Sequence, residues 1–206
     1  MSSSAQVGSS EPHVLDHDHF DAKTIQEMLP LRMMSTVVRG FGRGSTDLGI
    51  PTANLDRTAI KLLNNSSNKA LLTFDDLPCG IYWGFCRIGE KSAQGGDGTT
   101  VYKTAVSIGY NPTYNNKEKT IEPHLIAPPK DARRHASSCG ETLMGVFYDQ
   151  PIRLSVVGYL RPELPFEGLE KLVEAIKNDI VNAEQLGDSS DKKVTDEKEW
   201  VASEST

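Results

Sequence analysis

Thr120-Ile121-Glu122-Pro123-His124-Leu125-Ile126 alternates polar and apolar side chains along most of its length. A period of two predicts a β-strand with one face on a hydrophobic core. Ile121 and Leu125 would share that face, and Glu122 and His124 would share the opposite one. An acid beside an imidazole leaves two interpretations open: a general base with a polar partner, or a surface pair of little consequence.

The same period recurs in other short apolar stretches bounded by Gly, Pro or Asn, which is typical of strands. The predicted strands are Ser35–Arg39, Gly80–Ile88, Thr100–Ile108, Thr120–Ile126 and Ile152–Leu160. After Gly168 the apolar spacing changes to three and four, which predicts one amphipathic helix ending near Gly187. Five or more antiparallel strands and one late helix indicate a mainly β fold, a barrel with the helix packed against it.

Composition divides the chain into one domain between two tails. Residues 1–22 and 187–206 are small, polar or charged, and they hold too few apolar side chains to offset the entropy of ordering. We therefore expect a mobile N-terminal arm and a mobile acidic C-terminal tail. Residues 23–186 would form the barrel domain, with surface insertions near 56–78 and 127–141, where the connections are too long for tight turns.

The net charge of -6 belongs to the two ends of the chain. Residues 1–20 hold three acids and no Lys or Arg, and residues 187–206 hold six acids against three bases, so the body between them is neutral. Nucleic-acid binding requires clustered Lys and Arg, and we expect no nucleic-acid partner. The three cysteines show no Cys-x-x-Cys spacing and fit neither a disulfide framework nor a zinc site.

The hydropathy of the chain argues against a membrane protein. Its mean hydropathy is -0.40, and no apolar run approaches the length of a membrane span. The first basic residue is Lys23, so the start of the chain resembles neither a secretory signal nor a mitochondrial peptide. We expect a cytoplasmic protein without a membrane span, and association with mitochondria or microsomes stays open.

A glycine-rich stretch, Arg39 to Asn54, holds the first candidate site. Gly at alternate positions lets backbone amides approach an anion closely, so the stretch predicts either a phosphate-binding loop or a bulged hairpin; it matches no P-loop pattern and no dinucleotide-binding pattern. It ends in Pro51-Thr52-Ala53-Asn54, where a hydroxyl and an amide oxygen point to the same side of an extended chain. Such oxygens suit Mg²⁺ that is also held by substrate phosphates, or they serve only to satisfy the turn.

A third window surrounds Arg161, at the end of a predicted strand, with prolines on either side and Phe166 nearby. The guanidinium and the aromatic ring could receive a planar ligand. Equally, they could end the strand and attach the helix to it.

Together these windows resemble the riboflavin kinase family, in its monofunctional eukaryotic form and most closely in its fungal members. The four matching motifs occur in order: RGFGRGSTDLGIPTANL (39–55), CGIYWGFCRIG (79–89), VSIGYNPTYNNKEKTIEPHL (106–125) and VVGYLRPELPFEGLEKLVEAIKNDI (156–180). The resemblance implies a six-stranded antiparallel Greek-key (split) barrel with a C-terminal helix. It also implies transfer of the γ-phosphate of ATP to the 5′-hydroxyl of riboflavin, dependent on Mg²⁺, Zn²⁺ or another divalent ion, by a monomer.

The family's functional positions can be placed on this chain one at a time. Its catalytic base falls on Glu122, its metal ligands on Thr52 and Asn54, and its flap on the stretch that begins at Gly40. The expected ATP-binding residues are Gly40, Gly42, Gly44, Ser45, Thr46, Thr52, Asn54, Leu125 and Tyr148. The expected riboflavin-binding residues are Arg161, Leu164 and Phe166.

Three positions depart from the family pattern. Thr46 stands where animal members commonly have Lys, Asp149 replaces the Gly of a Phe-Tyr-Gly motif, and Ala127 with an insertion stands where animal members have a second His. Activity should survive these changes, with an altered affinity for ATP. Two other functions remain to be weighed: a flavin-binding module without turnover, and an unrelated barrel that binds an oligonucleotide or a sugar.

Overall fold

The computed structural model describes residues 21–40, 51–63, 74–89, 98–110, 118–131, 143 and 146–203. Its strands are β1 (Leu31–Val38), β2 (Asn54–Leu55), β3 (Lys61–Leu63), β4 (Gly80–Ile88), β5 (Tyr102–Tyr110), β6 (Lys119–Ile126) and β7 (Pro151–Arg161). Its helices are α1 (Ala22–Met28), α4 (Leu169–Gly187) and α5 (Lys192–Ala202), with a short 3-10 helix η1 (Phe74–Asp76).

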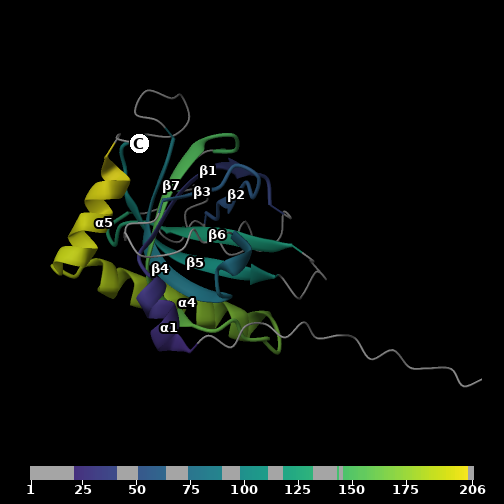
Figure 1. Cartoon of the computed structure of the whole chain (residues 1–206). Coiled ribbons are helices and arrows are strands. Elements are labelled where there is room, and N and C mark those ends of the chain that lie inside the picture. The colour runs from purple at the N-terminus through teal and green to yellow at the C-terminus, as the bar shows by residue number, and fades with distance from the viewer. Residues whose placement is uncertain are drawn as a thin grey trace, which may run out of the picture.

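The strands form one antiparallel sheet that is nearly closed into a barrel (Figure 1). The neighbours run in the order β2-β1-β7-β4-β5-β6, and β3 adds to β1 outside this path. β4, β5 and β6 follow one another as a meander, whereas β7 returns to lie between β1 and β4. The predicted antiparallel barrel is thereby confirmed.

Closure of the barrel depends on the segment just before and within β2. Thr52 pairs with His124 of β6 in an antiparallel bridge. The Ala53 amide donates to the Pro123 carbonyl (3.0 Å), and the Leu125 amide donates to the Pro51 carbonyl (2.8 Å). In this pattern the bridged residues are a non-hydrogen-bonded pair, which brings their side chains close together.

The barrel interior is filled by alternate residues of its strands, as the period of two predicts. In β6, Ile121 and Leu125 face inward while Glu122 and His124 are less buried, so the predicted division of faces is correct. The principal buried side chains are Met33, Val37, Leu55, Tyr82, Val106, Ile108, Ile121, Leu125, Ile152 and Leu154.

A second apolar cluster lies outside the barrel, beneath the two C-terminal helices. α4 packs on β4 and β5, and α5 packs on β7 and β4 (Figure 1). The cluster consists of Trp83, Phe85, Ala105, Ile126, Val157, Ala183, Val194 and Val201. Because helices cover its outer face, β4 is buried on both sides, unlike the half-exposed β1. None of the described helices is long and apolar enough to cross a membrane.

Helix α5 occupies residues that the sequence analysis assigned to a mobile acidic tail. It begins at Asp191, whose carboxylate accepts a hydrogen bond from the Lys193 amide (2.8 Å), as an N-cap does. Glu197, only 3% exposed, accepts from both Nε and Nη2 of Arg32 (2.9 and 3.1 Å). The Ser155 hydroxyl also donates to Glu197 (2.7 Å), so one carboxylate joins α5 to β1 and β7.

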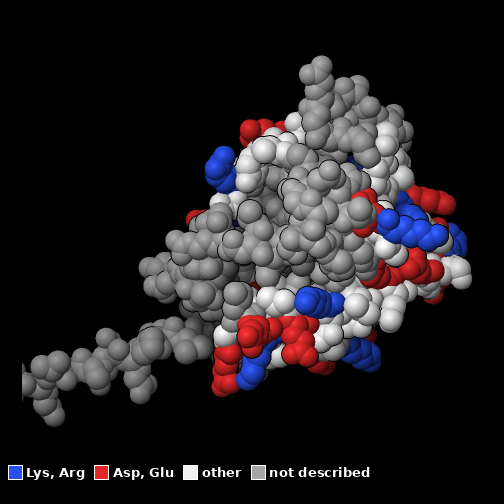
Figure 2. Space-filling view, turned by 180° about the vertical axis from the view of Figure 1, so that it is seen from behind, with Lys and Arg blue, Asp and Glu red and all other residues white. Residues whose placement is uncertain are grey.

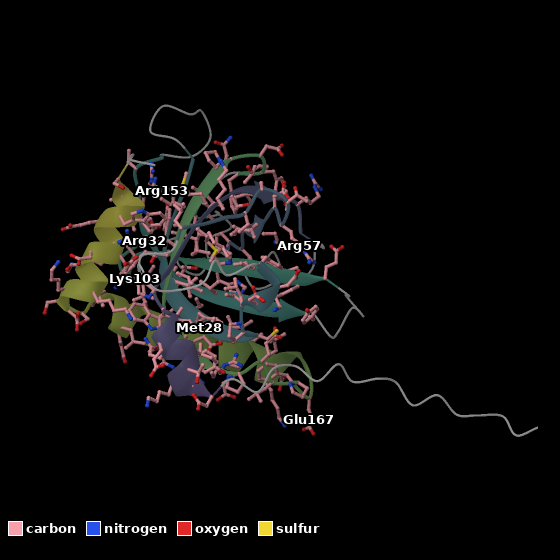
Figure 3. All side chains as sticks on the ribbon, viewed as in Figure 1. Met28, Arg32, Arg57, Lys103, Arg153 and Glu167 are labelled. Atoms are coloured by element: carbon pink, nitrogen blue, oxygen red, sulfur yellow. The ribbon has the colours of Figure 1, made fainter. Side chains whose placement is uncertain are left out.

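Aromatic and backbone contacts complete this attachment. Arg153 lies 4.3 Å from the ring centre of Trp200, and Arg32 lies 5.1 Å from it. Arg87 of β4 donates to the carbonyls of Val201 and Ser203, both at 3.0 Å. Figure 3 shows Arg32 and Arg153 pointing toward α5. The arginines that hold α5 lie far from it in the sequence, and composition alone therefore gave the wrong expectation.

Other elements differ from the sequence expectation in number and extent. α1 was not predicted, β1 begins at Leu31 and not at Ser35, and the stretch near 56–78 includes β3, which pairs with β1, together with η1. That stretch is therefore partly built into the sheet. Of the second expected insertion, the structure describes only residues 127–131.

The buried contact at Glu197 leads to a stability prediction. Glu197→Ala should lower the free energy of unfolding by about 3 kcal/mol, because it leaves the Arg32 guanidinium without its carboxylate in a largely buried place. Chemical denaturation measures this loss. Glu199→Ala, an exposed change on the same helix, should cost no more than about 0.5 kcal/mol. Equal stabilities of the two variants would mean that α5 is not held by this contact.

Candidate active site

The barrel closure places two candidate site residues side by side. Thr52 Oγ1 lies 2.7 Å from Nδ1 of His124, which the bridge holds opposite it. Burial of the ring lowers the pKa of His124 to about 4, so the imidazole is neutral near pH 7. A neutral ring with an unprotonated Nδ1 accepts the hydrogen of the Thr52 hydroxyl and leaves the oxygen lone pairs directed elsewhere.

Thr52 and Asn54 share one face of their segment. The residues that alternate with them, Ala53 and Leu55, are buried in the barrel core, so the hydroxyl and the amide face outward. Asn54 lies directly against Gly40, where any Cβ atom would collide with the Asn54 amide. A glycine at position 40 therefore lets the end of β1 pass next to this amide.

The pair fits a divalent cation that is shared with a substrate. A hydroxyl and an amide carbonyl are neutral oxygen donors, which Mg²⁺ accepts when phosphates and water complete its coordination. The described part of the chain holds no cluster of three or more His, Cys, Asp or Glu side chains that could bind a metal ion alone. The donor set thus suits an ion that arrives with a phosphate ligand.

Glu122 lies on the same outer face, on the neighbouring strand β6. Its Oε1 accepts a hydrogen bond from the Thr120 hydroxyl (3.0 Å), two residues earlier on that face. Burial raises the pKa of Glu122, although the Thr120 hydrogen bond acts in the opposite direction. A carboxylate with a raised pKa is a stronger base than an ordinary exposed glutamate.

Tyr148 lies in a turn beside the end of β1. The Asp149 amide donates to the Val37 carbonyl (2.8 Å), and the Arg39 guanidinium lies 5.0 Å from the centre of the Tyr148 ring. The turn therefore adjoins Gly40. Asp149 has φ of 63°, a left-handed conformation that Gly adopts freely and that Asp tolerates better than most residues.

Leu125 is an expected nucleotide-binding residue whose side chain faces the barrel core, and its expected role stays a prediction. Its side chain is 1% exposed and belongs to the barrel core. Only its backbone, through the bond to Pro51, takes part in the closure beside Thr52. The alternation within β6 turns the Leu125 side chain inward, as it does that of Pro123, so a contact with the nucleotide would be made through the backbone.

Arg161 connects the end of β7 to α4. Its Nε and Nη2 donate to the two carboxylate oxygens of Asp179 (2.9 and 2.7 Å), and its guanidinium lies 5.6 Å from the centre of the Phe166 ring. Of the two arrangements considered for this window, a site for a planar ligand and an attachment of the helix to the strand, the structure shows the attachment. Leu164, 54% exposed, remains accessible on the same segment.

Four expected nucleotide-binding positions, Gly42, Gly44, Ser45 and Thr46, lie outside the described residues. The structure also brings to the site two residues that the sequence analysis did not single out. Thr120 could have been found from the strand period, since it precedes Glu122 by two residues. Glu163 lies near Glu122 only because the segment after β7 crosses β5, which no local pattern indicates.

Charged side chains of both signs lie on the surface of the described part of the chain. Figure 2 shows acidic and basic residues intermingled on the described part of one face. This agrees with the neutral body counted from the sequence, and the expected absence of a nucleic-acid partner stays a prediction.

The chain is similar to known proteins in both sequence and fold. The family model described as "Flavokinase: Riboflavin kinase" matches residues 27–186. The riboflavin kinase of Mus musculus is 38% identical over 157 residues, which cover 76% of this chain and 81% of that protein. The riboflavin kinase of Aspergillus fumigatus is 34% identical over 166 residues, covering 73% of this chain and 72% of that protein.

The crystal structure of riboflavin kinase from Trypanosoma brucei is similar in fold, with a TM-score of 0.52 at 19% sequence identity. The similarity covers 86% of this chain and 92% of that chain. From the extent of the family match and the identity to these relatives, this chain belongs to the riboflavin kinase family.

Proposed function

We propose that this protein transfers the γ-phosphate of ATP to the 5′-hydroxyl of riboflavin and releases FMN and ADP. The observation that carries the proposal is the meeting of Thr52, Asn54 and Glu122 on one outer face of the barrel, in a chain that the family model matches over residues 27–186. A metal-and-phosphate site next to a base is what phosphoryl transfer to an alcohol needs.

In this proposal Glu122 accepts the proton of the 5′-hydroxyl as its oxygen attacks the γ-phosphorus in line. The Thr120 hydroxyl holds one carboxylate oxygen and leaves the other for the substrate. Burial raises the pKa of the carboxyl and with it the basicity of the carboxylate. Phosphoryl transfer passes through a loose transition state, so the base contributes about 10²- to 10⁴-fold and positioning contributes the rest.

Thr52 and Asn54 would hold Mg²⁺, with Zn²⁺ or another divalent ion as alternatives. When bound with ATP, the ion would neutralise charge on the phosphates. The contribution of the chain is to fix its two oxygens: His124 orients the Thr52 hydroxyl, and Gly40 makes room for the Asn54 amide. Both contacts are supported by the barrel closure and need no ligand to form.

The remaining roles follow the resemblance. The glycine-rich stretch that begins at Gly40 and the Tyr148 turn would contact the nucleotide, and the contact of Arg39, next to Gly40, with Tyr148 supports this. Leu164 and Phe166 would contact the flavin ring, with Arg161 holding their segment against α4. A monomeric state and a cytoplasmic location stay predictions. No observation favours a flavin-binding module without turnover.

The first test is FMN formation from riboflavin, ATP and Mg²⁺, followed by chromatography. The wild-type protein should form FMN, and Glu122→Gln should lower kcat at least 10²-fold while flavin binding, measured by fluorescence, is retained. Glu118→Gln, an exposed change at the start of β6, serves as the control and should keep kcat. Full activity of Glu122→Gln would remove this residue from the mechanism. If the wild type binds riboflavin but forms no FMN, the alternative of a flavin-binding module without turnover would be supported.

A second prediction concerns the metal. Thr52→Val should raise the Mg²⁺ concentration for half-maximal activity by about tenfold or more, because it replaces an oxygen donor with a methyl group of similar size. Thr195→Val, an exposed change on α5, should leave the Mg²⁺ requirement unchanged. An unaltered requirement in Thr52→Val would show that this hydroxyl does not bind the ion.

A third prediction concerns Asp149. Asp149→Asn should lower the KM for ATP about two- to fivefold, because it removes an exposed negative charge beside the proposed nucleotide site. Asn tolerates the left-handed conformation at this position, so the turn should persist. Asp188→Asn, at the end of α4, serves as the control, and its KM for ATP should not change. If Asp149→Asn also keeps the wild-type KM for ATP, the nucleotide does not bind near this turn.

A further inference from the structure

Glu163 follows β7 and lies over the outer face of β5. The Ser107 hydroxyl donates to its Oε1 at 3.4 Å, near the limit of a hydrogen bond. At Gly109 an added Cβ would collide with Oε2 of the same carboxylate. Ser107 and Gly109 are alternate residues of one strand, so the carboxylate rests on their shared face, over a glycine that leaves space for it.

This position is next to that of Glu122. In the pairing of β5 with β6, Ser107 lies directly opposite Glu122, and Gly109 lies opposite Thr120, the hydrogen-bond partner of Glu122. The Glu163 carboxylate, which lies over β5, and the Glu122 carboxylate of β6 therefore lie next to each other on one face of the sheet.

Within the described residues, no cation forms an ion pair with Glu163. Arg161, the nearest basic residue on its own segment, is engaged by both oxygens of Asp179. Burial and the charge of Glu122 raise the pKa of Glu163 to about 7, while Ser107 and Arg161 act in the opposite direction. Two adjacent carboxylates without a cation between them repel each other, so their proximity does not stabilise the folded protein.

Glu163 also has unused capacity to accept hydrogen bonds. A carboxyl group accepts at both oxygens, and Ser107 occupies one site of one oxygen with a long bond. Part of Glu163 is exposed although its carboxyl group packs over β5, so a ligand can reach it, and the pair of Arg161 with Asp179 holds its segment in place. A ligand that brings several hydroxyl donors to this face would satisfy both Glu122 and Glu163.

We propose that Glu163 binds a hydroxyl group of the ribityl chain of riboflavin while Glu122 receives the hydroxyl that reacts. The inference rests on the proposed function and extends it to the selection of a polyol. The ribityl chain carries hydroxyls on successive carbons, so one of them can reach the neighbouring strand when the terminal hydroxyl is at Glu122. Glu163 thereby orients the chain and favours flavins that carry a polyol.

The test compares riboflavin with lumiflavin, which has the same ring system but no ribityl chain. Binding of each flavin is followed by fluorescence quenching in the full-length protein. Glu163→Ala should weaken riboflavin binding about tenfold, the effect of losing a hydrogen bond to a charged acceptor, and should change lumiflavin binding less than twofold. Glu163→Gln, which keeps one acceptor oxygen, should lie between Glu163→Ala and the wild type.

Glu167→Ala provides the matched control. Glu167 is exposed four residues later and pairs only with Lys171 among the described side chains, and Figure 3 shows it at the periphery, away from the barrel. This variant should bind both flavins as the wild type does. Thermal unfolding establishes that each variant is folded; where Glu163→Ala is not, the isosteric Glu163→Gln carries the comparison.

Unchanged riboflavin binding, or equal weakening of both flavins, would overturn the role of Glu163. A raised Mg²⁺ requirement without a change in riboflavin binding would overturn it as well and would place a cation between the two carboxylates. After either of these outcomes the proposed function still stands, provided that the wild type forms FMN. Failure of the wild type to bind riboflavin or to form FMN would overturn both proposals.

Discussion

The pairing of a short extended segment with β6 is the constraint on which the rest of this structure depends. Two backbone hydrogen bonds, from Ala53 to Pro123 and from Leu125 to Pro51, convert an open sheet into a nearly closed barrel. They remove an exposed edge and seal the core around Leu55 and Leu125. The same bonds set the register that puts Thr52 beside His124, so closure and assembly of the candidate site are one event.

The inner and outer faces of the barrel sheet differ in the residues they carry. The inner face is mainly apolar, whereas the outer face is divided between helix packing and polar chemistry. α4 and α5 cover β4 and the adjoining parts of β5 and β7, which leaves the outer face of β6, with Glu122 and Thr120, beyond the helices. Arg161 lies at the boundary between these regions, since it joins the end of β7 to Asp179 of α4 and fixes the segment that carries Glu163.

The sequence predicts the features that arise from neighbouring residues. The strands β4, β6 and β7 follow from local alternation, and the start of α4 follows from the change of spacing after Gly168. The attachment of α5 was not predictable because Glu197 meets Arg32 and Ser155 from remote strands. Leu125 shows that the strand period sets the direction of a side chain, and Glu163 shows that a site residue brought in by a crossing segment leaves no local sign.

The alternation in β6 makes the proposed site sensitive to errors in strand pairing. One side of the strand fills the core and the other carries the proposed chemistry, so a shift of pairing by a single residue would exchange the two sets. Glu122 and His124 would enter an apolar interior, and Ile121 and Leu125 would face water. A form with this shift would lose both the core packing of β6 and the proposed site. Catalytic competence and correct strand alignment are therefore inseparable, and enzymatic turnover reports directly on the fraction of molecules that have folded in register.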